Sequence, residues 1–340
     1  MAQAVDETIC VIIAAKNASD TIGLAVASAL REAAVSEVVV VDDGSSDGTD
    51  QAALAANDGS GRLKIISFEK NQGPSAARNA AIAQSSAPLI AILDADDFFF
   101  PGRFAPMLEE SGWDFIADNI AFVADPAALS APAQFQSRAR ELSLVQFVEG
   151  NISQRGKPRG ETGFLKPVMR RSFIVANGLT YDEGLRLGED YDFYVRALAL
   201  GARYKVIEHC GYGAVVRGDS LSSRHRTEDL RRLYEADNAV LAAMQLPPDA
   251  RSVITHHRDH IKARYELREF LDVKRQSGKG GAIRHILSRP AALVPVVTGI
   301  FFDKYDALRR NNTSAASLPT TPRYLLAGVP VAGRADTKRT

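Results

Sequence analysis

The feature that most constrains the fold is an alternation of short, almost continuously apolar runs with helix-like segments. The apolar runs fall in the first third of the chain, at residues 9–15, 38–42, 63–68 and 89–94. Such runs are typical of strands that are covered on both faces. Helix-like segments lie between them, at about 20–33, 48–57 and 74–84. The alternation predicts βαβ units built around a parallel sheet.

Polar and acidic residues stand where the predicted strands end. They are Asn17 after the first run, Asp42 and Asp43 at the second, and Asp94, Asp96 and Asp97 at the fourth. The carboxyl ends of parallel strands meet at one edge of a sheet, where α/β proteins bind their ligands. Like charges gathered at such an edge are costly unless a cation or hydrogen bonds compensate them. We therefore expect the functional site at this edge.

The segment Asp94-Ala95-Asp96-Asp97 is the first candidate for chemistry. Carboxylates two residues apart, just past a strand, can reach one hard cation and a ligand beside it. Mg²⁺ or Mn²⁺ held by one or two carboxylates keeps coordination positions open for substrate phosphates. The alternative is a polar loop in which an aspartate caps a helix. The acidic pair at a neighbouring strand end favours the cation site.

Two turns carry residues suited to a nucleotide. At Asp42-Asp43-Gly44 one carboxylate can point inward, towards a base, while the other fixes the turn. Gly73-Pro74 opens a helix and sets Arg78 one turn in, where it could meet the nucleotide. A plain turn and a surface arginine are the alternatives.

Glu189-Asp190 stands at the start of a further amphipathic helix, predicted over 191–200. Carboxylates are favoured there by the helix dipole, so capping alone would also explain the pair. A base that takes a proton from a sugar hydroxyl must project from a fixed element into the cleft. Asp190 is our candidate for this base.

The order of five segments resembles glycosyltransferase family 2: VIIAAKNA, VVVVDDGSSDGT, NQGPSAARNAAI, ILDADD and GEDYDFYVRAL. The resemblance covers about residues 8–226, roughly two thirds of the chain. It implies the GT-A fold, a Rossmann-like, mostly parallel sheet flanked by helices, here with a helical C-terminal extension. It also implies a metal-dependent, inverting transferase. Bacterial exopolysaccharide enzymes of the succinoglycan kind are similar, which favours UDP-glucose as donor and an undecaprenyl-diphosphate-linked saccharide as acceptor.

The resemblance also implies roles for particular residues. Asp96 would bind Mn²⁺ or Mg²⁺, with Asp94, Asp97 and His225 as further candidate ligands, and Asp190 would be the general base. A surface histidine is the alternative for His225. The implied donor-binding residues are Ala14, Asn17, Asp42, Asp43, Gly73, Arg78, Asp94 and Ala95. Those implied on the acceptor and diphosphate side are Glu189 and Arg217.

Two residues depart from the family pattern. Lys16 stands where the family often has an aromatic residue, and Ala14 where it often has proline. Without that aromatic residue, stacking on a base and the choice of nucleotide stay open. The sequence also lacks the Q-x-x-R-W signature and the multiple spans of processive members, which favours addition of a single sugar.

A sugar nucleotidyltransferase is the main enzymatic alternative, because it also joins an α/β nucleotide domain to acidic metal ligands. Its Gly-rich loop would follow the first strand, where this chain has Lys16-Asn17-Ala18-Ser19. A dinucleotide dehydrogenase is disfavoured because no G-x-G-x-x-G stands there. An inactive nucleotide-sugar-binding protein is disfavoured by the presence of both Asp94-Ala95-Asp96 and Asp190.

Charge is distributed unevenly, although the chain has 41 Lys plus Arg and 41 Asp plus Glu. Residues 258–340 hold 16 basic and 7 acidic residues, which leaves 25 and 34 for residues 1–257. Zero net charge gives no global field that would recruit nucleic acid. We expect residues 1–226 to form the catalytic domain, with a donor part near 8–125 and an acceptor part near 126–226. Residues 227–312 would form a basic helical extension and 313–340 a flexible tail.

The predicted extension combines basic residues with a short apolar run. Lys274, Arg275, Lys279, Arg284, His285 and Arg289 precede the apolar residues 291–302. This pattern suits an amphipathic element on an anionic membrane surface, and helices packed on the catalytic domain are the alternative. The run is too short to span a bilayer. Since the N-terminus has no basic signal-peptide region, we expect a cytoplasmic protein, peripheral at the inner membrane.

Overall fold

A computed structural model of the chain describes residues 7–129, 131–135, 138–153, 162–216, 226–310 and 322–326. The first third has the predicted alternation: β1 (Ile9–Ala15), α1 (Ile22–Leu30), β2 (Val35–Asp42), α2 (Thr49–Ala55), β3 (Leu63–Ser67), α3 (Pro74–Gln84) and β4 (Leu89–Ile92). These four strands pair in parallel in the order β3-β2-β1-β4. The prediction of βαβ units is confirmed.

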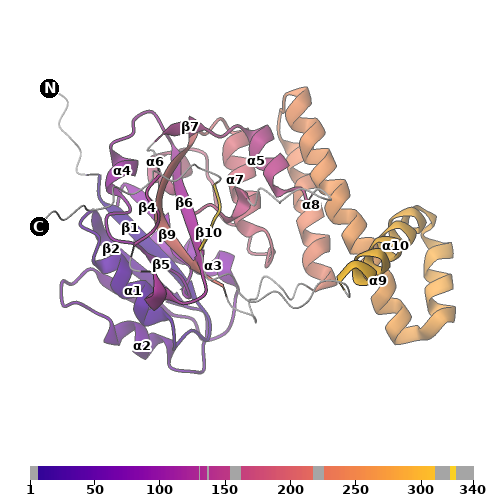
Figure 1. Cartoon of the computed structure of the whole chain (residues 1–340), viewed down its shortest axis with the longest axis horizontal. Helices are drawn as coiled ribbons and strands as arrows, with labels where there is room; N and C mark the ends of the chain where they lie inside the picture. Colours follow the sequence, from indigo (N-terminus) through magenta and orange to yellow (C-terminus); the bar gives the residue numbers. More distant parts are fainter. Residues whose placement is uncertain are drawn as a thin grey trace, which may run out of the picture.

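The second third extends the same sheet (Figure 1). Its strands are β5 (Phe98–Phe99), β6 (Phe115–Val123), β7 (Ala139–Glu141), β8 (Val168–Arg170) and β9 (Tyr204–Val215), joined from the C-terminal part by β10 (Arg323–Tyr324). Its helices are α4 (Ala105–Leu108), α5 (Leu144–Asn151), α6 (Arg171–Ala176) and α7 (Glu189–Ala199), with the short 3₁₀ turns η1 (Pro126–Ala128) and η2 (Thr162–Phe164). The full sheet order is β3-β2-β1-β4-β8-β6-β9-β5.

Strand pairing is mixed in this second part. β6 and β9 are parallel, whereas β8 runs antiparallel to both β4 and β6. β5, β7 and β10 also pair antiparallel with their neighbours. The predicted α/β class is confirmed, and the parallel pairs other than β6–β9 all join the first four strands.

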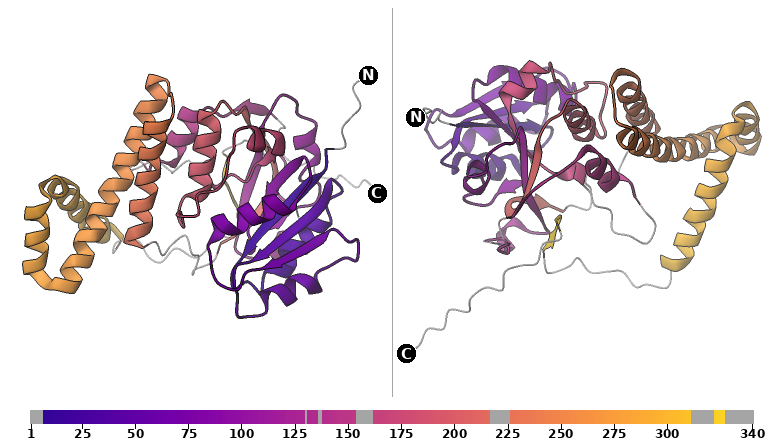
Figure 2. Two further views of the ribbon diagram at one scale, coloured as in Figure 1. Left: turned by 180° about the vertical axis from the view of Figure 1, so that it is seen from behind. Right: turned by 90° about the horizontal axis from the view of Figure 1, so that it is seen from above.

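The two faces of the sheet support two cores. Ile9, Val11 and Ile13 of β1 pack with α1 and α2, while the intervening Cys10 and Ile12 pack with α3, α5 and α7. This alternation follows from the two-residue period of a strand. Helices therefore cover both faces of the sheet, as Figure 2 shows.

The C-terminal part of the described chain is helical, as predicted. It contains α8 (Thr227–Ala243), α9 (Pro248–Ser288), the 3₁₀ turn η4 (Pro290–Ala292) and α10 (Leu293–Arg310). In Figure 1 this helical extension projects from the side of the sheet that carries α5 and α7. Among the described residues, no helix has both the length and the apolar character needed to cross a bilayer.

A buried polar triad joins the extension to α7. The Tyr191 hydroxyl donates to Asp237 Oδ1 at 3.1 Å, and His257 Nδ1 lies 2.7 Å from Asp237 Oδ2. The rings of Tyr191 and His257 stack with centroids 4.2 Å apart. Each residue comes from a different helix, α7, α8 or α9, so the triad fixes α8 and α9 against α7.

We expect Asp237→Ala to lower the free energy of unfolding by about 2–3 kcal/mol, because it leaves two buried polar partners without an acceptor. Urea denaturation would measure the loss. Asn238→Ala is the matched control, since Asn238 is the exposed neighbour on the same helix, and should change stability by less than about 0.5 kcal/mol. Equal losses in the two variants would contradict a role for the triad.

Candidate active site

The carboxyl ends of β1, β2 and β4 form the edge at which the predicted residues gather. Asp42 ends β2, and Asp94 lies two residues beyond the end of β4. β1 lies between these strands, so their ends are separated by two strand spacings, or about 10 Å. That span suits an elongated ligand lying along the sheet edge.

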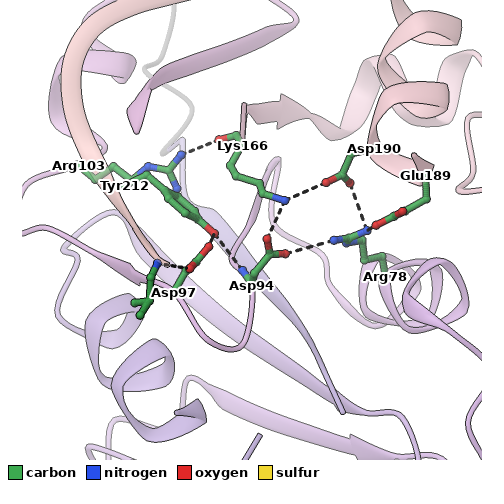
Figure 3. A network of polar contacts seen from close by, with 9 residues as sticks. Arg78, Asp94, Asp97, Arg103, Lys166, Glu189, Asp190 and Tyr212 are labelled. Atoms are coloured by element: carbon green, nitrogen blue, oxygen red, sulfur yellow. Dashed lines mark hydrogen bonds and ion pairs between the residues drawn. The ribbon is translucent and has the colours of Figure 1, made fainter. Parts of the chain in front are cut away.

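Five charged side chains make a network at the β4 end (Figure 3). Lys166, which precedes β8, places its Nζ 2.8 Å from Asp94 Oδ2 and 2.9 Å from Asp190 Oδ2. Arg78 of α3 lies 3.3 Å from Asp94, 2.8 Å from Glu189 and 3.2 Å from Asp190. Both cations are buried. The network therefore ties the end of β4 to the first turn of α7.

Electrostatics keeps these groups charged. Burial alone would lower the pKa of Arg78 and of Lys166, but the neighbouring carboxylates, Asp190 foremost, outweigh burial and raise both pKa values. Burial would likewise raise the pKa of Asp94, but the charges of Lys166 and Arg78 hold it below its ordinary value. Opposite charges at these distances offset part of the cost of burying each ion, and loss of one partner would leave a buried charge uncompensated.

One oxygen of this network has an ion pair but no hydrogen bond. Asp190 Oδ1 is buried and accepts no hydrogen bond from any described residue, although the Arg78 guanidinium lies 3.2 Å away. Oδ2 of the same carboxylate accepts from Lys166. Asp190 thus stands in the first turn of α7 with both oxygens beside buried cations, Oδ2 hydrogen-bonded to Lys166 and Oδ1 ion-paired with Arg78.

Asp97 has a different environment. It accepts hydrogen bonds from the Tyr212 hydroxyl at 2.7 Å and from the Val215 N–H at 2.9 Å. Burial, together with the negative charges of Asp94 and Asp96, raises the pKa of Asp97 to about 8. Asp97 therefore differs from Asp94, whose pKa is lowered by the charges of Lys166 and Arg78.

This raised pKa predicts a pH effect on stability. Between the ordinary value of 3.8 and about 8, the folded protein holds a proton on Asp97 that the unfolded chain releases. The stabilisation from this proton is complete below about pH 4 and is lost as the pH rises through about 8. Between pH 5 and 7 in EDTA, wild type should lose about 1 kcal/mol per pH unit relative to Asp97→Asn, measured by urea denaturation. Parallel pH profiles would contradict this.

The charges fit a divalent cation that keeps part of its coordination shell for a ligand. Asp94, Glu189 and Asp190 set three carboxylates against two cations. Burial, more than the charges of Asp94 and Asp96, raises the pKa of the neighbouring Asp97. Asp96 is half-buried beside them. Mg²⁺ or Mn²⁺ held by one or two carboxylates and completed by phosphates suits such a set.

A compact three-ligand cluster occurs elsewhere in the described residues. Oxygen and nitrogen atoms of Glu266, Glu269 and His285 lie within 4.8 Å of one another in α9. The Arg289 guanidinium already pairs with Glu269 there, so this group is an ion-pair network.

The loops after β1 and β2 hold each other in place. Asn17, at φ 47°, accepts from the Ser46 N–H at 3.1 Å and donates its own N–H to the Ser45 hydroxyl at 2.8 Å. The Lys16 amine, which stands at the position of the expected aromatic residue, donates to the Gly44 carbonyl. Lys16 therefore ties the loop after β1 to the loop after β2.

Asp42 and Asp43 make hydrogen bonds to different loops. Asp42 accepts from the Ser45 N–H at 3.0 Å through Oδ1. Both oxygens of Asp43 accept backbone N–H groups at the start of α3, from Gln72 at 2.6 Å and Gly73 at 2.9 Å. Asp43 thus fixes the loop before α3, and Asp42 is the carboxylate of the pair with an oxygen not used in this loop contact.

The remaining predicted residues fall into three groups. Gly73, at φ 100°, opens α3 with Pro74 at its first turn, a conformation that favours glycine. Ala14 is half-buried near the end of β1, and Ala95 is buried. Arg217 and His225 lie outside the described residues.

Sequence reasoning missed Lys166 and Tyr212. Lys166 interrupts the mainly apolar segment 164–169, and that interruption is a signal for a buried cation. Its place is set by Arg103, which pairs with Asp118 at 2.8 Å and donates to the Lys166 carbonyl at 2.6 Å. Tyr212 also accepts from the Asp94 N–H at 3.2 Å, and its sequence neighbours gave no comparable signal.

Comparisons with known proteins agree with this arrangement. The family model described as glycosyl transferase family 2 matches residues 10–174. The chain is 57% identical over 318 residues to the succinoglycan biosynthesis protein ExoU of Rhizobium meliloti (strain 1021), with 93% of each chain covered. It is 30% identical over 119 residues to the UDP-Glc:alpha-D-GlcNAc-diphosphoundecaprenol beta-1,3-glucosyltransferase WfgD of Escherichia coli, covering 35% of this chain and 45% of WfgD.

A solved structure shares the fold. The crystal structure of S. aureus TarS 1-349 in complex with UDP-GlcNAc matches with a TM-score of 0.56 and 21% identity, covering 77% of this chain and 72% of that one. The architecture is thus the GT-A fold. The similarity to ExoU along nearly its whole length and the match to the family model show that this chain belongs to glycosyl transferase family 2.

Proposed function

We propose that the protein is an inverting glycosyltransferase that moves glucose from UDP-glucose to a lipid-diphosphate-linked saccharide in exopolysaccharide biosynthesis. The observation that carries this proposal is Asp190, a buried carboxylate on a fixed helix with one oxygen held by Lys166 and one accepting no hydrogen bond from the described residues. It faces the sheet edge where the donor phosphates would lie.

The reaction would be a single displacement. The acceptor hydroxyl oxygen forms a bond to the anomeric carbon while the bond from that carbon to the diphosphate oxygen breaks. The hydroxyl proton passes to Asp190 Oδ1, and the diphosphate leaves with the electron pair. Attack opposite to the leaving group converts an α-linked donor into a β-linked product.

The chain's own residues prepare this step. Lys166 and Arg78 hold Asp190 in position and compensate its charge in a buried setting. The end of β2, with Asp42, lies about 10 Å from the end of β4, so a nucleotide can place its base at one strand and its diphosphate at the other. Asp96, with Asp94 or Asp97, would hold Mn²⁺ or Mg²⁺, which would neutralise charge on the leaving diphosphate.

The relatives support the choice of substrates. ExoU acts, by its name, in succinoglycan biosynthesis, and WfgD uses UDP-Glc and a diphosphoundecaprenol-linked sugar. The same donor and acceptor classes fit an edge site that combines a nucleotide-length span with acidic metal ligands. A lipid-linked acceptor and a nucleotide-sugar donor would place the reaction at the cytoplasmic face of the inner membrane.

Transfer assays with radiolabelled donors test the proposal. We expect UDP-glucose, with Mn²⁺ and a lipid-diphosphate saccharide, to give a labelled lipid product and UDP, and EDTA to suppress it. The anomeric coupling constant in an NMR spectrum of the product should report a β linkage. An α linkage would contradict inversion, and pyrophosphate release from a nucleoside triphosphate and a sugar phosphate would favour the nucleotidyltransferase alternative.

A further inference from the structure

The end of the helical extension combines positive charge with exposed apolar side chains. Residues 274–301, here called the basic hairpin, contain five Lys or Arg and no Asp or Glu. All five basic side chains are exposed: Lys274, Arg275, Lys279, Arg284 and Arg289. The surrounding helices differ, because α8 and the first part of α9 intersperse acidic and basic residues.

The hairpin arises from a sharp bend in α9. Gly278 adopts φ 65° and ψ −166°, a backbone conformation that favours glycine and interrupts the helix. α10 then packs back on the first part of α9, so closely that an added Cβ on Gly299 would lie 2.6 Å from Leu267. Ala292 and Val296 are buried in the same part of the structure. One side of α10 is therefore occupied by α9 (Figure 1).

Both helical segments of the hairpin also expose large apolar side chains. Leu287 is 77% exposed, and Ile283 lies four residues earlier on the same helical face. On α10, Val294 is 69% and Val297 is 56% exposed, three residues apart. Exposed apolar residues at helical spacing beside an all-basic segment are the features of a helix that lies in a lipid interface.

We propose that the basic hairpin docks on the surface of an anionic phospholipid bilayer. Its apolar side chains would enter the boundary between headgroups and acyl chains, and its basic side chains would bind the lipid phosphates. Charge argues for this occupant over pairing of two hairpins. Arg289 pairs with Glu269 of the same chain. The other four basic residues of each copy would still be brought together with no acidic residue in 274–301. The docking surface would hold the proposed reaction at a membrane, and this inference does not depend on which sugar is transferred.

Vesicle flotation tests the proposal with the full chain. Wild type should float with vesicles of about 70% phosphatidylcholine and about 30% phosphatidylglycerol. With vesicles of pure phosphatidylcholine it should stay at the bottom of the gradient. The triple variant Lys274→Gln, Lys279→Gln, Arg284→Gln should bind anionic vesicles about 100-fold more weakly, given the attraction expected per basic residue. The triple variant Leu287→Ser, Val294→Ser, Val297→Ser should also lose flotation.

Matched controls separate this surface from a general effect. Leu54→Ser with Val175→Ser alters two equally exposed apolar residues outside the hairpin and should float like wild type. Transfer to a water-soluble acceptor should be unchanged in both hairpin variants, so loss of membrane binding is distinguishable from failure of the proposed reaction. Wild type that stays unbound with anionic vesicles, or hairpin variants that float normally, would overturn the proposal. Sedimentation showing a lipid-free dimer that the serine variant disrupts would instead assign the surface to a second copy.

Discussion

Asp190→Asn is expected to lower kcat for sugar transfer by about 10²–10⁴-fold while leaving donor affinity nearly unchanged. The amide has the size of the carboxylate but cannot take the proton of the acceptor hydroxyl. Donor binding should persist because Asp42 and Asp94 keep their carboxylates, and Lys166 and Arg78 remain paired with Asp94. Initial rates with UDP-glucose and calorimetric titration with the same donor in Mn²⁺ would measure the two effects separately.

Asp192→Asn provides the control for this prediction. Asp192 is also buried on α7, but it pairs with Arg196 at 2.7 Å and stands apart from the network around Asp190. Its variant should keep kcat within a few-fold of wild type. Comparable turnover by Asp190→Asn and wild type would remove Asp190 from the role of general base, and loss in both variants would point to damage to the helix.

Lys166→Met should lower the free energy of unfolding by about 3–5 kcal/mol, the range for breaking a buried ion pair. Methionine fills similar volume but leaves Asp94 and Asp190 with only the guanidinium of Arg78 between them. Urea denaturation at neutral pH would measure the loss. The same substitution in the Asp190→Asn background should cost less, because one of the two carboxylates then carries no charge.

Lys64→Met is the matched surface control. Lys64 pairs with Glu37 at 3.0 Å, but its side chain is half exposed, so the change should cost no more than about 1 kcal/mol. An equally small effect of Lys166→Met would show that solvent already screens the network. Equal costs in the wild-type and Asp190→Asn backgrounds would show that Lys166 stabilises the fold without acting through Asp190.

The N-terminal strands were predictable because burial on both faces leaves a continuous apolar run. Ile9–Ala15 and residues 38–42 carry that signal, whereas β2 begins three residues earlier, at Val35, because Ser36 and Glu37 interrupt the apolar pattern; Pro74 marks the start of α3. The mainly apolar residues at 204–207 predict a short strand, but β9 extends to Val215, because its later residues, which include Glu208, His209 and two glycines, are held by long-range pairing with β6. Such pairing depends on residues nearly 90 positions away, which a local pattern does not report.

The site was predictable where it depends on strand ends and helix starts. Asp94 and Asp190 come together because βαβ topology and the first turn of α7 bring them to one edge. The cations between them were harder to predict. Arg78 was expected beside a nucleotide, and Lys166 had no assigned role, because burial of a lysine is decided by the surrounding fold. Arg103 and Asp118, a fully buried pair behind Lys166, show the same dependence.

The triad of Tyr191, Asp237 and His257 has a consequence for how such enzymes diversify. Tyr191 follows the proposed general base directly in sequence, so the residue that anchors the extension and the residue that takes the proton share one helical turn. A chain ending before α8 would leave the Tyr191 hydroxyl without its acceptor and uncover apolar parts of α7. We therefore expect relatives that have α7 with this tyrosine also to have α8 and α9, and we do not expect these helices to be exchanged as a separate unit.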